Sequence, residues 1–136
     1  MIVKLVKLYK NKIIKNKKGK IIKYVSTKDF FFKKFGEIYF SEINPNKKKG
    51  WTLHKKNTCL IMCLTGKVKF HIIDKRGREL NITLNSNKKK ILKIPPGLFF
   101  SFKSFKKKSL IVNCIENAHR DQEVKKYNKI SNYLIN

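Results

Sequence analysis

The stretch CLIMCLTGKVKFHI, residues 59–72, carries two different strand patterns on either side of one glycine. Residues 59–64 are continuously apolar, as expected of a strand that is buried on both faces. After Gly66, residues 67–72 alternate strictly, so three apolar side chains share one face while two lysines and His71 share the other. We therefore expect a sheet whose half-exposed strands turn lysines towards solvent, with His71 among them.

Similar patterns recur along the chain. They predict six further short strands, at residues 21–25, 37–43, 79–84, 90–94, 99–103 and 110–115. The charged stretch 11–20 contains Gly19, which indicates a loop or a hairpin turn, and residues 95–97 (PPG) mark a tight turn. Near the C-terminus, apolar residues recur every three to four positions and predict a short amphipathic helix: Val124, Tyr127, Ile130 and Leu134.

Eight strands followed by one helix predict an all-β fold, an antiparallel barrel or jelly roll with a short C-terminal helix. The 136 residues fit one domain, 1–136, and 41% of them are hydrophobic, enough for a core of this size. No run approaches 18 apolar residues, and lysines interrupt residues 1–7. We therefore expect neither a transmembrane helix nor a signal peptide, and a cytoplasmic location.

The net charge is +26, from 34 Lys and Arg against 8 Asp and Glu. Such an excess usually points to nucleic acid or an anionic membrane. Only Arg76, Arg78 and Arg120 are arginines, however, whereas nucleic-acid readers favour the planar guanidinium group. Lysine, asparagine and isoleucine share AT-rich codons, which can account for much of the excess. We interpret the lysine triplets at 47–49, 88–90 and 106–108 as solvated loops between strands, and expect no nucleic acid or membrane as the main partner.

The three cysteines are Cys59, Cys63 and Cys114. Their odd number and the lack of a secretory signal argue against a disulfide framework. No further His or Cys pair lies near Cys59 and Cys63 to complete a zinc site. We expect buried free thiols.

Two segments flank the apolar strand and carry a resemblance. Residues 50–56 read GWTLHKK, and residues 94–102 read IPPGLFFSF. Their order and spacing resemble the two conserved segments of the cupin superfamily. More narrowly, they resemble the dTDP-4-dehydrorhamnose 3,5-epimerase (RmlC-like) family and its sugar-nucleotide 3,4-ketoisomerase relatives. Residues 36–41 and 113–124 are similar to the same branch, so the resemblance covers roughly residues 20–134, with its motif-bearing core at about 20–116.

The resemblance implies a β-jelly roll, a homodimer, and a nucleotide-sugar ligand such as a dTDP-4-keto-6-deoxyhexose, used in deoxysugar synthesis for surface polysaccharide such as lipopolysaccharide. In this family the 4-keto group acidifies a neighbouring C–H bond, a base removes that proton, and the proton returns at another position or on the opposite face. This chemistry needs a base whose pKa is near the working pH, an acid for the oxygen, and cations for the diphosphate.

The family places its catalytic histidine two residues after the motif glycine, where this chain has Thr52. The ketoisomerase branch has a second histidine two residues further on, and here that position is His54. His54 shares a strand face with Thr52, so the resemblance implies that His54 is the catalytic acid or base. His119 lies in residues 117–121 (NAHRD), which are similar to a loop of the same branch, and we expect at most a minor role for it. Substrate contacts are implied for six further residues: Tyr39, Ser41, Lys49, Thr52, Cys59 and Phe100.

Metal-binding cupins supply three histidines and a carboxylate, whereas the matching positions here are Thr52, His54, Cys59 and Phe100. One ligand of four does not hold a divalent metal, so we expect no metal and no other cofactor. Two alternatives stay open, the first because of these departures and the second because of the basic charge. One is a catalytically degenerate cupin that binds a sugar nucleotide or a partner protein without chemistry. The other is a basic nucleic-acid-binding β-barrel, which would expose aromatic residues beside lysines.

Overall fold

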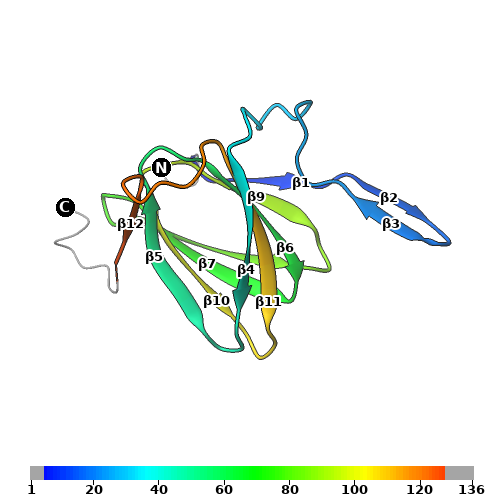
Figure 1. Cartoon of the computed structure of the whole chain (residues 1–136). Coiled ribbons are helices and arrows are strands. Elements are labelled where there is room, and N and C mark those ends of the chain that lie inside the picture. The colour runs from blue at the N-terminus through cyan, green and yellow to red at the C-terminus, as the bar shows by residue number, and fades with distance from the viewer. Residues whose placement is uncertain (1–4, 128–136) are drawn as a thin grey trace.

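A computed structural model describes residues 5–127, and every named element in that range is a strand (Figure 1). The strands are β1 (Lys7–Lys10), β2 (Ile13–Asn16), β3 (Gly19–Ile22), β4 (Glu37–Ile43), β5 (Lys48–His54), β6 (Cys59–Thr65), β7 (Lys67–Ile73), β8 (Glu79–Asn85), β9 (Lys90–Ile94), β10 (Phe99–Ser104), β11 (Ser109–Ile115) and β12 (Val124–Lys126). Within this range, no helix has the length and apolar composition that crossing a membrane requires.

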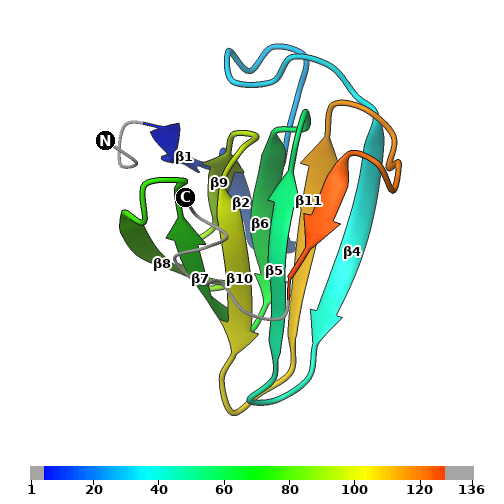
Figure 2. The same ribbon diagram turned by 90° about the vertical axis from the view of Figure 1, so that its left-hand side faces the viewer.

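Ten of these strands form two five-stranded antiparallel sheets that face one another (Figure 2). One sheet has the order β1-β9-β6-β11-β4, and the other has the order β12-β5-β10-β7-β8. Sequence neighbours such as β9 and β10 lie in different sheets, so the chain crosses repeatedly between the two layers. This arrangement confirms the predicted all-β jelly roll.

The core lies between the sheets and follows the predicted alternation. Val68, Phe70 and Ile72 on β7 are all completely buried, and they pack against apolar side chains of β6, β9 and β11. Gly66 joins β6 to β7 with a φ of +82°, and a Cβ there would collide with Ser109. The glycine therefore allows the tight turn that places the two strands in opposite sheets. All three cysteines are free and buried, as predicted.

Seven of the eight strands predicted from sequence are recovered with ends that differ by at most one residue, whereas of residues 21–25 only Ile21 and Ile22 lie in a strand, β3. Two further predictions need correction. The lysine triplet 47–49 does not form a loop, because Lys48 and Lys49 belong to β5. The predicted C-terminal helix is wrong where the structure describes it: Val124–Lys126 form β12, which pairs with β5. Trp51 and Tyr127 continue this pairing with two backbone hydrogen bonds, of 2.8 and 2.9 Å. The backbone groups of residues 124–127 therefore bond to the free edge of β5 instead of bonding to one another as in a helix. Ile130 and Leu134 lie outside the described residues.

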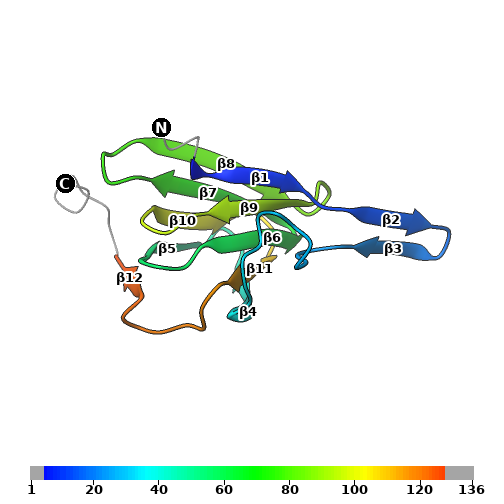
Figure 3. The same cartoon turned by 90° about the horizontal axis from the view of Figure 1, so that it is seen from above.

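The charged stretch 11–20 contributes to a hairpin, one of the two forms expected for it. β2 and β3 form a two-stranded ribbon that extends away from the two sheets (Figure 3). The aromatic-rich segment that follows β3 returns to the molecule and packs Phe31 against Tyr9, with ring centroids 4.2 Å apart. This segment covers the outer face of the β6 sheet, where Leu60, Ile91 and Cys114 are buried beneath it.

Candidate active site

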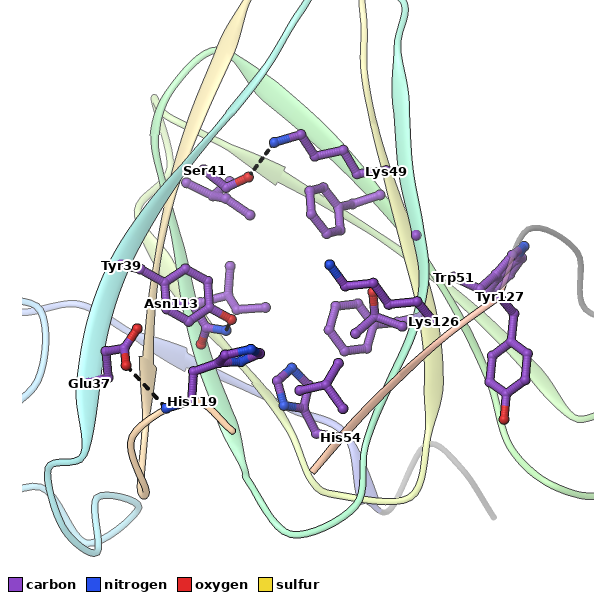
Figure 4. A pocket seen from close by; sticks show the side chains of 17 residues that line it. Glu37, Tyr39, Ser41, Lys49, Trp51, His54, Asn113, His119, Lys126 and Tyr127 are labelled. Carbon is purple, nitrogen blue, oxygen red and sulfur yellow. Dashed lines mark hydrogen bonds between the residues drawn. The ribbon is translucent and has the colours of Figure 1, made fainter. Parts of the chain in front are cut away.

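A cavity of about 630 Å³ lies between the two sheets (Figure 4). Strands β4 and β11 line it on one side, and β5, β10 and β12 line it on the other. Its walls combine apolar side chains such as Ile61, Phe100 and Ile111 with histidine, tyrosine, lysine and amide groups. A mainly apolar hollow with a few converging polar groups is typical of a small-molecule site.

His54 is paired with a buried carboxylate at one end of this cavity. Its Nδ1 lies 2.9 Å from Oε2 of Glu123. The other carboxylate oxygen of Glu123 accepts the backbone N–H groups of Lys56, at 3.0 Å, and Asn57, at 2.8 Å. His54 is 5% exposed and Glu123 is 9% exposed, so the pair is shielded from bulk water.

These contacts determine which nitrogen of His54 carries a proton. Burial by itself raises the pKa of the Glu123 carboxyl, but the hydrogen bonds from Asn57, Lys56 and His54 outweigh burial and hold the pKa below its ordinary value. A carboxylate only accepts hydrogen bonds, so Nδ1 of His54 must be the donor. Nε2 of the neutral imidazole is then left unprotonated and able to act as a base.

Tyr39 supplies a hydroxyl from the facing strand β4. The side-chain amide of Asn113 on β11 donates to this hydroxyl at 2.8 Å, so the O–H of Tyr39 is free to donate in turn. Burial raises the pKa of Tyr39 above its ordinary value. The group therefore stays protonated near neutral pH and can donate a hydrogen bond to a substrate oxygen.

Two lysines bring positive charge to the cavity. Lys49 on β5 donates to the hydroxyl of Ser41 on β4, with the two atoms 2.8 Å apart. Lys126 on β12 lines the cavity, and Figure 4 shows its amine inside the hollow. The amines of Lys49 and Lys126 thus give the cavity positive charge that suits an anionic ligand.

The β5 motif places Thr52 and His54 along the same cavity, as the strand alternation predicts. Phe100 on β10 lies beside them, with its ring nearly parallel to that of His54 and the centroids 6.1 Å apart. Phe100 therefore offers a flat apolar surface next to the imidazole rather than a metal ligand. Among residues 5–127, no cluster of three or more His, Cys, Asp or Glu side chains is arranged to hold a metal ion.

The structure brings together five of the six residues expected to contact substrate: Tyr39, Ser41, Lys49, Thr52 and Phe100 all line the cavity. Cys59 differs, because it is 1% exposed, belongs to the core and does not line the cavity. Burial raises the pKa of its thiol to about 12, so a thiolate is not available there.

Sequence reasoning missed Glu123, Asn113, Lys126 and the position of His119. Glu123 lies 69 residues from His54 in the chain, and no local spacing links the two. Lys126 was assigned to a helix, which hid its place on a cavity-lining strand. The one available signal was the clustering of His119, Asp121 and Glu123 in an otherwise acid-poor chain.

Comparison with known proteins identifies what this arrangement is similar to. A family model described as "FdtA: WxcM-like, C-terminal" matches residues 3–134. A search of curated protein sequences gives no significant match. Among solved structures, a dTDP sugar isomerase from Desulfovibrio desulfuricans is 26% identical and superimposes with a TM-score of 0.87, covering 95% of this chain and 87% of that chain.

Two further structures share the fold at lower identity. QdtA, a sugar 3,4-ketoisomerase from Thermoanaerobacterium thermosaccharolyticum solved in complex with TDP, is 21% identical with a TM-score of 0.82, covering 96% of this chain and 92% of that chain. The 3,5-epimerase RmlC from Legionella pneumophila, solved with dTDP-4-keto-L-rhamnose, is 15% identical with a TM-score of 0.82, covering 96% and 76%.

Proposed function

Because the chain belongs to the FdtA family of WxcM-like C-terminal domains, we propose that it is a nucleotide-sugar isomerase acting on a dTDP-4-keto-6-deoxyhexose. The observation that supports this proposal most directly is the buried pair of His54 and Glu123. The imidazole of His54 lines a cavity whose size suits a nucleotide sugar. A carboxylate that fixes the tautomer of a histidine is the arrangement required of a general base. The dTDP sugar isomerase that is 26% identical supports the same class of reaction.

In the proposed reaction, Nε2 of His54 removes the proton from C3, next to the C4 ketone. The hydroxyl of Tyr39 donates a hydrogen bond to the ketone oxygen, where negative charge develops as the enolate forms. Glu123 stabilises the imidazolium that results, through the hydrogen bond to Nδ1. Each of these groups lies on a rigid strand or is held by a hydrogen-bonded loop, which keeps the geometry ready for reaction.

The remaining contacts would hold the ligand. Lys49 and Lys126 supply positive charge for the diphosphate, while Ser41 and Thr52 offer hydroxyl groups. Phe100 provides an apolar surface beside the reacting carbon. We expect no contribution from Cys59, because its side chain has almost no exposed surface.

The test is incubation with dTDP-4-keto-6-deoxyglucose in deuterated water, followed by NMR. We expect deuterium to enter at C3, and His54→Asn to lower that rate by about 10²- to 10⁴-fold.

A second candidate function, binding without chemistry, is favoured by Thr52 and Phe100, which stand where relatives carry histidines. It predicts no exchange in the wild-type protein and a loss of affinity alone in His54→Asn.

We also propose that the protein works as a cytoplasmic homodimer in deoxysugar synthesis for a surface polysaccharide such as lipopolysaccharide. Strand β4 lies at the edge of its sheet and exposes Ile38 (41%) and Phe40 (63%), which supports pairing with a second copy. Light scattering at micromolar concentration tests the oligomeric state, and a monomer would contradict it.

A further inference from the structure

His119 faces His54 inside the cavity. Both imidazoles line the same hollow, and Figure 4 shows the two rings pointing toward one another. His54 comes from β5, whereas His119 comes from the connection between β11 and β12. The cavity thus holds two imidazole groups from different parts of the chain, although only one of them stands at a motif position.

The position of His119 is fixed by its loop. Its backbone N–H donates to Oε1 of Glu37 at 3.1 Å. Asn117, two residues earlier in the same loop, is held by the side chain of Asn57, which accepts its N–H at 2.9 Å and donates to its carbonyl at 3.1 Å. Gly36 lies directly under this loop, where a Cβ would collide with the backbone of Asn117. These contacts hold the loop tightly against the barrel in a single position.

The ring of His119 is paired as well. Its Nε2 lies 3.1 Å from Oδ1 of Asp121, so the carboxylate accepts the Nε2–H and leaves Nδ1 unprotonated in the neutral ring. The side chain of His119 is 45% exposed, which leaves it accessible to a ligand that enters the cavity. The carboxylate of Asp121 itself is fully exposed and does not line the cavity, so His119 brings its ring into the hollow from the solvent side, whereas the His54–Glu123 pair is buried.

Moving a ketone from C4 to C3 requires two separate proton transfers. The C3–H bond breaks, its proton goes to a base, and an enediolate forms with its negative charge on the C4 oxygen. A second group then takes the proton of the C3 hydroxyl and gives it to the C4 oxygen, after which the C3 carbonyl forms and C4 takes up the proton held by the base. In total one proton moves from C3 to C4 and one moves from O3 to O4, with no oxidant or reductant.

The C3–H bond breaks perpendicular to the plane of the forming enolate, whereas the O–H bonds at O3 and O4 lie near that plane. A base placed for the carbon proton is therefore badly placed for the oxygen proton, which favours a second group. Thr52 has no useful basicity, and the raised pKa of Tyr39 disfavours giving up its proton completely. Glu37 also lines the cavity, but one of its carboxylate oxygens holds the backbone of His119. His119 is the remaining cavity-lining group suited to accept and return a proton near neutral pH.

We propose that His119 is the second acid–base residue of this site and transfers the proton from O3 to O4 during 3,4-ketoisomerisation. This assignment rests on the proposed function, because it requires a 4-keto sugar nucleotide in the cavity.

The experiment follows two signals from dTDP-4-keto-6-deoxyglucose in deuterated water: deuterium entry at C3, and formation of the 3-keto product. The variants are His119→Gln, which keeps a hydrogen-bond donor but cannot relay a proton, His119→Ala with added imidazole, and His54→Asn. Arg120→Gln is the matched control, because Arg120 is the next residue of the loop and does not line this cavity. Affinity for dTDP is measured for each variant.

For His119→Gln we expect product formation to fall by about 10²-fold or more, C3 exchange to fall by less than about tenfold, and dTDP affinity to stay within about threefold. Imidazole restores product formation in His119→Ala, and Arg120→Gln behaves as wild type. His54→Asn loses both signals together. The inference is overturned if His119→Gln matches wild type, if both signals and affinity fall in parallel, if imidazole restores nothing, or if wild type exchanges C3 without forming the 3-keto product. If wild type shows neither signal, the proposed function itself fails and the assignment of His119 falls with it.

Discussion

The Nδ1 of His54 lies 2.9 Å from the carboxylate of Glu123, although the two residues belong to β5 and to the loop before β12. The same carboxylate also holds the backbone of Lys56 and Asn57. Glu123 thereby ties the connection after β11 to the end of β5, and it links the stability of the fold to the orientation of the imidazole.

Stability at acid pH is expected to depend on Glu123. Its pKa is lower in the folded protein than in the unfolded chain, so the ionised carboxylate stabilises the fold at pH values above its ordinary pKa, about 4.5. This contribution is lost as the pH falls through the lowered folded value. Urea unfolding between pH 7 and pH 3 should show wild type more stable than Glu123→Gln at pH 7, with the difference shrinking below about pH 4. A difference that is constant with pH would contradict the ionised pair.

Removal of the Tyr39 hydroxyl is expected to slow the reaction without unfolding the protein. Tyr39→Phe deletes the donor to the ketone oxygen and leaves the Asn113 amide without its acceptor. We expect turnover to fall by about 10²-fold, the usual effect of losing one donor to a developing oxyanion. Tyr9→Phe is the matched control, because Tyr9 packs against Phe31 outside the cavity. Equal activity in the two variants would remove Tyr39 from the mechanism.

Neutralising Lys126 is expected to weaken nucleotide binding. Lys126 and Lys125 are neighbours on β12, but only Lys126 lines the cavity. Lys126→Gln should weaken dTDP binding by about three- to tenfold and reduce its dependence on salt, as expected when an ionic contact to a phosphate is lost. Lys125→Gln should bind as wild type. Equal effects from both substitutions would indicate a general charge effect rather than a specific contact.

The cysteines are expected to be inert in the folded protein. Cys59, Cys63 and Cys114 are each at most 2% exposed, and burial raises the pKa of each thiol. A thiol reagent at pH 8 should react slowly with native protein and rapidly with all three thiols in denaturant. Fast reaction of a native thiol would contradict the placement of the cysteines in the core.

The fold was predictable because local patterns of apolar and polar residues indicate where the strands lie and which faces they bury. The alternation at residues 67–72 and the apolar run at 59–64 reflect side-chain positions that repeat every two residues, and the structure places both as expected. Tyr39, Ser41, Lys49, Thr52 and His54 were likewise assigned from motif positions, and all five line the cavity.

The rest of the site depends on contacts between distant segments. Glu123 meets His54 only because β12 adds to the edge of β5, a pairing made by backbone groups that leave no sequence signature. The spacing of Val124 and Tyr127 fits a helix as well as it fits this short strand, so the sequence alone does not distinguish the two. Cys59 was placed in the site by its motif position, whereas its side chain points into the core.

The most direct test of the central claim is deuterium exchange at C3 of dTDP-4-keto-6-deoxyglucose, measured by NMR for wild type, His54→Asn and Glu123→Gln. We expect exchange in wild type, a loss of about 10²- to 10⁴-fold in His54→Asn, and an intermediate loss in Glu123→Gln, because glutamine keeps one acceptor but not the charge. Binding of dTDP should be nearly unchanged in both variants. Exchange in wild type that persists at the same rate in His54→Asn would contradict the assignment of His54 as the base.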